Sequence, residues 1–175
     1  MSSVDLVILG MLLEKPQSAY ELQKDVVNHH YDKWSKIGIP TIYQNVHRLQ
    51  AAGYLQSEMQ PGEKRTNRAV YSITEAGKVY FTKLMQKIVD RGVAFLFDFN
   101  IVITNMNKIS KTEADVLFHK LHNNIKNAAL KNAALATKYA DIPLVGRAIF
   151  QQQHLLYQAL LDWLISFKAE FAEEA

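Results

Sequence analysis

Residues 41–73 read TIYQNVHRLQAAGYLQSEMQPGEKRTNRAVYSI, and this stretch joins a helical pattern to a hairpin pattern. Its first part carries apolar residues at the spacing of one buried helix face: Ile42, Val46 and Leu49. Gly53 ends that pattern, and two short β-prone runs follow at residues 54–59 and 69–73. Because the segment between the runs is polar, basic and rich in turn residues, the stretch predicts a helix followed by a β-hairpin with a basic tip.

Two further helices are predicted before this stretch. The first has one buried face, made by Val4, Val7, Ile8, Met11 and Leu12. Ser18 and Glu21 form a capping-box pattern, which satisfies exposed amide donors and starts the second helix. A turn at residues 38–40 separates the second helix from the third. Three short helices followed by a hairpin with a basic tip are the element order of a winged helix-turn-helix, in which the third helix enters the major groove of DNA.

The outer face of the predicted third helix is polar. Opposite its apolar residues lie side chains that can bind base edges or phosphates: Thr41, Gln44, His47 and Arg48, with Tyr43 at the edge. Between residues 33 and 71 only Glu58 and Glu63 oppose the basic side chains Lys33, Lys36, Arg48, Lys64, Arg65 and Arg68. The alternative is that a small domain simply has a solvated helix face and a charged turn. The pattern favours a DNA-binding surface over that alternative.

The remainder of the chain is predicted to be helical. Thr74 followed by Glu75 is an N-cap pattern that opens a long helix, which Gly92 ends or bends. Further helices are predicted over residues 95–106, 113–139 and 144–171. The predicted fold class is therefore mainly α with a small β-hairpin wing. We expect a winged helix-turn-helix domain over residues 1–78, a connecting helix over 79–91, and a helical dimerisation and possible effector domain over 92–175.

The sequence also resembles the PadR family of bacterial transcriptional regulators. The resemblance is carried by Leu9-Gly10-Met11-Leu12, Ser18-Ala19-Tyr20-Glu21-Leu22, Pro40-Thr41-Ile42-Tyr43, Arg48-Leu49, Gly53-Tyr54-Leu55 and Tyr71-Ser72-Ile73-Thr74-Glu75-Ala76-Gly77. These motifs lie in the first half of the chain; the second half is similar in length, helical character and a long closing helix. One departure is Gly38-Ile39-Pro40, where family members often carry a small or polar helix-opening residue. The resemblance implies dimers held by C-terminal helices, usually repressors, some of them released from DNA by small aromatic or amphipathic effectors.

The resemblance also implies roles for particular residues. The residues similar to recognition-helix contacts are Tyr43, Gln44, His47 and Arg48. Ser18 and Tyr20 are similar to phosphate contacts at a helix start, and the wing contacts are Lys64, Arg65 and Arg68. A phosphate contact needs little geometric precision, which favours Lys64 and Arg65 as contacts. Tyr43 is equally compatible with a packed position.

The last predicted helix carries a wide apolar face. Its heptad-like seam consists of Leu156, Leu160, Trp163 and Phe167, and Leu155, Leu161, Leu164 and Ile165 widen it beyond what one neighbouring helix would cover. A second protomer is the natural cover, so a homodimer is expected. The aromatic residues Phe95, Phe97 and Phe99, with Trp163 and Phe167, are interpreted as dimer core, with an effector pocket as the alternative. The residues that could form such a pocket are Phe95, Phe99, Arg147, His154 and Tyr157.

Other classes of protein are disfavoured by the composition and motifs. The chain has no cysteine, which excludes disulfides, thiolate metal sites and cysteine nucleophiles and favours the cytoplasm. No catalytic, phosphate-loop or cofactor motif is present, so neither an enzyme nor a cofactor is expected. Asp115, His119 and His122 share one helix face, but a solvated face is the preferred interpretation over a metal site. The apolar runs contain charged residues, so no signal peptide or membrane span is expected.

The sequence therefore predicts a homodimeric regulator that binds double-stranded DNA. Two recognition helices related by a two-fold axis would meet half-sites roughly 34 Å apart, so the operator should be a partial palindrome. We expect a repressor that a small-molecule effector releases by favouring one spacing of the two wings over the other. The alternative is a winged-helix module that binds a protein or sequesters a ligand and does not bind DNA. Net charge of +3 and a pI near 9.0 are compatible with both.

Overall fold

The computed structural model describes residues 3–29, 31, 41–61 and 67–174. The chain forms two compact units, Met1–Ala94 and Phe95–Ala175. None of the described helices is both long and apolar enough to cross a membrane.

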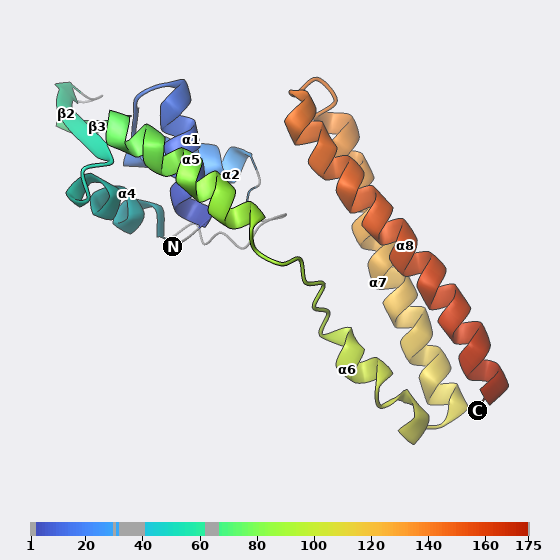
Figure 1. Ribbon diagram of the computed structural model, residues 1–175. Coiled ribbons are helices and arrows are strands. Elements are labelled where there is room, and N and C mark those ends of the chain that lie inside the picture. The colour runs from blue at the N-terminus through green and yellow to red at the C-terminus, as the bar shows by residue number, and fades with distance from the viewer. Residues whose placement is uncertain (1–2, 30, 32–40, 62–66, 175) are drawn as a thin grey trace. The chain divides into compact units, whose positions relative to one another are not determined.

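The first unit combines helices with a small antiparallel sheet (Figure 1). Its helices are α1 (Ser3–Glu14), α2 (Ala19–Asn28), α4 (Ile42–Ala51) and α5 (Glu75–Val89). Its strands are β1 (Gln17–Ser18), β2 (Leu55–Pro61) and β3 (Asn67–Ile73), in the spatial order β1-β3-β2. The predicted hairpin is present, with Leu55 opposite Ile73 and Pro61 opposite Asn67. The short strand β1, which pairs with β3, was not predicted from the sequence.

The core of the first unit is made by the apolar faces of its helices. The fully buried apolar side chains are Ile8, Leu9, Leu22, Val26, Ile42, Val46 and Leu49. These residues include the buried face that helical periodicity predicts for α4. Helix α1 is buried more widely than its predicted stripe, because Leu9 and the charged Asp5 are also completely buried.

The end of α4 is joined tightly to the start of α5. Gly53 has a φ of 77°, a left-handed conformation that glycine adopts without steric cost. The Thr74 hydroxyl donates to the Gly53 carbonyl at 2.8 Å and accepts from the Gly77 amide at 3.1 Å. A β-carbon on Gly77 would lie 2.2 Å from the Tyr54 carbonyl oxygen, so only glycine fits there. This junction fixes the hairpin between the two helices.

The second unit is a pair of long helices with a short helical segment before them (Figure 1). Helix α6 (Phe99–Ile103) and the 3-10 turn η3 (Met106–Lys108) precede α7 (Lys111–Lys138) and α8 (Leu144–Glu174), which pack side by side. A continuous helix over residues 95–106 was predicted, and this is wrong: residues 92–97 have no regular structure, and α6 is short. The side chains of Thr104 and Asn105 both donate to the Ile101 carbonyl, at 3.0 and 2.7 Å, and compete with a continuing helix.

Few side chains are buried in the second unit. Its buried residues are Met106, Ala114, Phe118, Ile125 and Leu164. Two polar contacts also tie α7 to α8: Asn132 donates to the Phe150 carbonyl at 3.0 Å, and Lys168 pairs with Asp115 at 2.8 Å. The start of α7 is a second capping box, formed by Ser110 and Glu113.

Candidate nucleic-acid interface

Helix α4 presents one buried and one exposed face. Ile42, Val46 and Leu49 are buried against the rest of the first unit. Tyr43, Gln44, His47 and Arg48 are all exposed. These four exposed side chains are among those that the sequence assigns to DNA, whereas Thr41, which it also assigns, is half-buried. Their contact with DNA stays a prediction, because the structure contains the protein alone.

Contacts to the sheet support one side of α4. The His47 ring packs edge-on against the buried Tyr71 of β3, with 6.3 Å between ring centroids. Gln50 donates from Nε2 to the Ser57 hydroxyl of β2 at 2.9 Å. Asn45 donates to the Thr41 carbonyl at 2.7 Å, across the first turn of the helix. Helix α4 therefore carries its exposed residues on a rigid support, which a base-reading surface requires.

Arg48 has a partner that sequence analysis missed. Its Nη2 donates to the Oδ1 of Asp5 in α1 and, at 3.0 Å, to the Oδ1 of Asn45. Asp5 is fully buried, whereas half of the Arg48 side chain is exposed. The available signal was a lone acidic residue inside the apolar run of residues 4–13. Arg48 therefore has an intramolecular role in addition to its predicted contact with DNA.

The start of α2 forms the predicted capping box. The Glu21 carboxylate accepts from the Ser18 amide at 2.8 Å and from its hydroxyl at 2.7 Å, and the Glu21 amide donates to that hydroxyl at 3.3 Å. Ser18 is only 6% exposed, and its hydroxyl is engaged in capping α2. Tyr20, two residues later, is 66% exposed and is accessible to a partner. The two predicted phosphate contacts at this helix start thus differ in accessibility.

Glu21 also binds the base of the wing. Arg68 of β3 donates from Nη1 to the other Glu21 carboxylate oxygen, Oε1, at 2.8 Å. The hydrogen bond from the Ser18 amide, together with those from the Ser18 hydroxyl and Arg68, holds the pKa of Glu21 below its ordinary value, against the opposing effect of burial. Arg68 lies opposite Gln60 in the hairpin. Lys64 and Arg65, predicted at the wing tip, lie outside the described residues.

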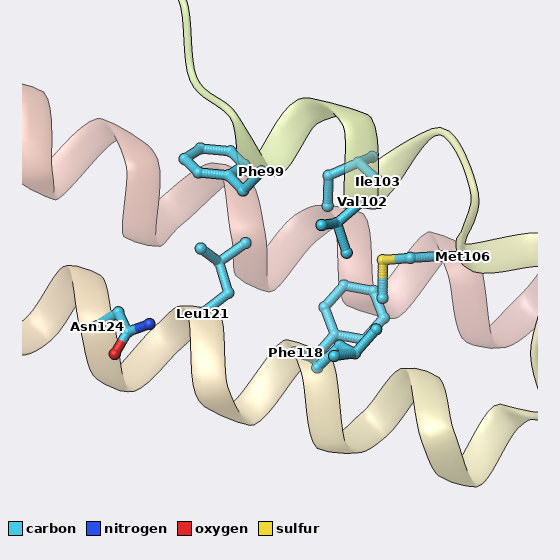
Figure 2. Close-up of a pocket in the computed structure, with 8 residues that line it drawn as sticks. Phe99, Val102, Ile103, Met106, Phe118, Leu121 and Asn124 are labelled. Carbon is cyan, nitrogen blue, oxygen red and sulfur yellow. The ribbon is translucent and has the colours of Figure 1, made fainter.

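An apolar pocket of about 150 Å³ lies in the second unit between α6, η3 and α7 (Figure 2). Its lining consists of Phe99, Val102, Ile103, Met106, Leu117, Phe118, Leu121 and Asn124. Asn124 supplies the one polar side chain in this set. Phe99 is the one predicted effector residue among them; Phe95, Arg147 and His154 are exposed elsewhere, and Tyr157 packs against the core of this unit. We call this cavity the α6–α7 pocket.

The predicted seam of α8 is partly covered by the same chain. Leu160 and Phe167 pack on the core of the second unit, and Leu156 is half-buried. Trp163 is 37% exposed and stacks on Phe167 at 5.7 Å and on Phe99 at 6.0 Å. Other apolar residues of α8 remain exposed: Leu144, Val145, Leu155 and Ile165. The helix pair therefore leaves an apolar surface uncovered.

Asp115, one of the three residues of the alternative metal site, is paired with a lysine. Asp115 forms an ion pair with Lys168, whose hydrogen bond and charge hold the pKa of Asp115 below its ordinary value. His119 and His122 lie beside that pair along the groove that Lys168 also lines. Within the described ranges, no three histidine or carboxylate side chains gather as a metal-binding group.

Residues 8–83 match the family described as the transcriptional regulator PadR-like family, and no curated protein matches the chain. Among solved structures, Bacillus subtilis PadR in complex with operator DNA has a TM-score of 0.78 at 16% identity, covering 97% of this chain and 98% of that one. The same protein in complex with p-coumaric acid has a TM-score of 0.78 at 15% identity, over 97% of both chains. The Vibrio cholerae virulence activator AphA has a TM-score of 0.71 at 17% identity, over 99% of this chain and 100% of that one. These likenesses confirm the predicted fold class, a winged helix followed by a helical region.

Proposed function

We propose that the chain, whose residues 8–83 match the PadR-like family of transcriptional regulators, is a regulator of that family that binds operator DNA as a homodimer and represses the promoters that it occupies. A small aromatic or amphipathic molecule releases it. Its partner is the genome, so its place of action is the cytoplasm. Its activity is binding, and no chemical step is assigned to it.

The observation that carries this proposal is the exposed polar face of α4. Gln44 and His47 point away from a fully buried face on a helix that is fixed against the sheet. In winged-helix proteins a helix at this place in the chain enters the major groove. The likeness to Bacillus subtilis PadR in complex with operator DNA supports the same use of α4 here.

Operator binding by α4 is tested with selected DNA fragments. We expect the double variant Gln44→Ala, His47→Ala to bind operator at least about tenfold more weakly, because each base contact contributes about 1–3 kcal/mol of discrimination. Binding to random DNA should change little, and Gln44→Ala alone should leave the melting temperature unchanged, whereas His47→Ala also removes the ring contact with Tyr71. Gln86→Ala, an exposed glutamine of α5, is the matched control and should leave operator binding intact. Equal weakening on operator and random DNA would instead assign Gln44 and His47 to backbone contacts.

The wing is expected to contact phosphates. Replacing Lys64 and Arg65 by alanine should make the slope of log affinity against log salt shallower by about two, since each phosphate contact contributes about 0.9. Sequence preference should survive, because phosphate contacts carry no base information. An unchanged slope, measured by titration at several salt concentrations, would show that the wing tip does not touch DNA.

The homodimer is proposed from the exposed apolar surface of α8. Leu155 and Ile165 are 60% and 62% exposed. Burying such an apolar side chain contributes about 1.5–3 kcal/mol, so covering this surface with a second copy would be favourable. We expect a dimer in sedimentation equilibrium at micromolar concentration. Trp163→Asp should weaken it, whereas Trp163→Phe, which keeps an apolar ring, should not. A monomeric wild-type chain would contradict the proposal.

The α6–α7 pocket is the proposed effector site. Its volume of about 150 Å³ suits a single aromatic ring, and cavities of about this size with apolar walls bind such rings. p-Coumaric acid, the ligand of the Bacillus subtilis PadR complex, is a suitable probe. It should weaken operator binding, and Leu121→Trp, which fills the pocket, should abolish that response. Leu130→Trp, at an exposed position of α7, is the control.

The rival proposal is a winged-helix module that binds a protein or sequesters a ligand. The exposed Tyr20 and Tyr43 would also suit a protein partner, because tyrosines are enriched at such interfaces. A band shift separates the two functions. Failure to shift any selected duplex at low salt would favour the rival.

A further inference from the structure

Asp5 is the acidic side chain with the most unusual position in the described part of the first unit. It lies in the first turn of the apolar helix α1 and is completely buried. Its Oδ1 accepts from Arg48, and its Oδ2 has no hydrogen-bond partner among the described residues. Removing a carboxylate from water is costly unless a partner charge compensates it. Arg48 is therefore the main compensation for burying Asp5.

The same arginine is tied along one edge of α4. Arg48 donates to Asn45 at 3.0 Å, and Asn45 donates to the Thr41 carbonyl at 2.7 Å, so the chain of contacts runs from the last turn of α4 to its start. Tyr80 of α5 lies close enough for the charges of Asp5 and Arg48 to act on its pKa, which burial chiefly raises. Tyr80 is itself fixed, because its ring stacks on Tyr54 at 4.1 Å. Arg48 thus lies where α1, α4 and α5 meet.

We propose that Asp5 is a positioning residue for operator recognition, which acts through Arg48 to set the rotation of α4 against α1. The inference rests on the proposed function, since it concerns how Gln44 and His47 are aimed. In this arrangement the half-exposed Arg48 side chain holds α4 against the buried Asp5 and does not read a base. The rotation of α4 matters because its side chains extend outward from the helix axis. A small turn about that axis therefore moves Gln44 and His47 together relative to the base edges.

Asp5→Asn tests the inference because a purely electrostatic role and a positioning role of Asp5 predict opposite changes in operator affinity. If Asp5 acted only as a charge, its removal would strengthen binding to DNA and would free Arg48 for a phosphate, steepening the salt slope by about 0.9. If Asp5 positions α4, operator binding should weaken while binding to random DNA stays equal or rises. We expect the ratio of operator to random affinity to fall by about fivefold or more, the range of coupling between residues in one network.

Two further variants make the test independent of the folding of Asp5→Asn. Arg48→Lys keeps the positive charge, but a lysine is shorter and ends in an ammonium in place of the planar guanidinium whose Nη2 holds both Asp5 and Asn45, so it should lower the same ratio. The double variant Asp5→Asn, Arg48→Gln should lower the ratio of operator to random affinity no further than the more affected of its two single variants. Each single variant already removes the same Asp5–Arg48 interaction. Glu58→Gln, which removes a negative charge from the exposed face of β2, is the matched control and should leave the ratio unchanged.

The outcomes separate this inference from the function on which it rests. A wild-type chain that does not distinguish operator from random DNA would overturn both. A discriminating wild type, with the ratio intact in Arg48→Lys and in folded Asp5→Asn, would overturn the positioning role alone. A lowered ratio in these variants and an unchanged ratio in Glu58→Gln supports it. Melting temperature is recorded for each variant, so that loss of the fold is not counted as loss of discrimination.

Discussion

The two compact units differ in how they bury their apolar residues. The first unit, residues 1–94, encloses a core of fully buried side chains contributed by α1, α2 and α4. In the second unit, α8 is the longest described helix, yet Leu164 is its one buried residue among those described. Leu144, Val145, Leu155 and Ile165 of the same helix are exposed. The first unit is thus a complete small fold, whereas the second carries more apolar surface than its own chain covers.

This difference suggests that the units have different partners. The exposed face of α4 is polar and suits the hydrogen-bonding edges of DNA. The exposed face of α8 is apolar and suits a second copy of the chain. A change in the first unit should therefore affect folding stability and DNA binding, whereas the same change on α8 should affect association. The leucine pair and the pair of capping serines test that division directly, because each pair has one residue in each unit.

The largest contrast is expected for truncation of a leucine. Leu22→Ala should lower the free energy of unfolding by about 3 kcal/mol, because Leu22 is fully buried and its loss leaves a cavity. Leu155→Ala, at a position 60% exposed, should change the stability of the monomer by less than about 0.5 kcal/mol but weaken dimerisation. Urea unfolding and sedimentation measure the two effects. Similar losses of stability would contradict the proposed difference between the units.

A pair of glycines gives the next contrast. Gly77→Ala should cost about 2 kcal/mol, because the new β-carbon would lie 2.2 Å from the Tyr54 carbonyl oxygen and force the junction of α4 and α5 apart. Gly92→Ala should be neutral or stabilise by up to about 1 kcal/mol, since no heavy atom lies within 4 Å and the unfolded chain loses freedom. Thermal unfolding followed by circular dichroism tests both. A neutral Gly77→Ala would mean that the junction is looser than described.

Each unit has a capping box, which permits a matched comparison of caps. Ser18→Ala should cost about 1–2 kcal/mol, because Ser18 is buried and also orders the glutamate that holds Arg68. Ser110→Ala should cost about 0.5–1 kcal/mol, because its capping box is exposed. Protection of the amides of α2 and α7 in hydrogen exchange reports each effect separately. A larger loss at Ser110 would reverse the predicted order.

The smallest effect is expected from pH. The Ser18 amide, with further help from Arg68, lowers the pKa of folded Glu21 below its usual value of 4.5. A lowered pKa in the folded state means that the stabilisation is present above about pH 4.5 and is lost as pH falls through the folded pKa. The side chain is 37% exposed, so solvent screening limits the loss to about 0.5 kcal/mol. Glu21→Gln should flatten the acid limb of a melting-temperature profile of the first unit, and an unaltered limb would contradict the assignment.

The sequence predicted those features that depend on neighbours within a few positions. Burial of one face imposes a period of 3.6 on a helix, so the inward residues of α4 could be assigned from spacing. The capping box at Ser18 is similarly local, because its two hydrogen bonds join residues three positions apart. The same reasoning failed over residues 95–106. Apolar content there fits a helix, but only residues 99–103 form one, and directly after it the side chains of Thr104 and Asn105 bind the Ile101 carbonyl.

The sequence by itself determined the order of the long helices and the hairpin, the fold class and the polar face of α4, because each follows from periodicity and caps. Only the tertiary structure decided what the charged residues around that face do. Arg48 meets Asp5 across 43 positions and Arg68 meets Glu21 across 47. Such pairings depend on how separate elements pack, and packing is a property of shape that spacing along one helix does not encode. The α6–α7 pocket was likewise decided by packing, since its walls come from a short helix, a 3-10 turn and a long helix.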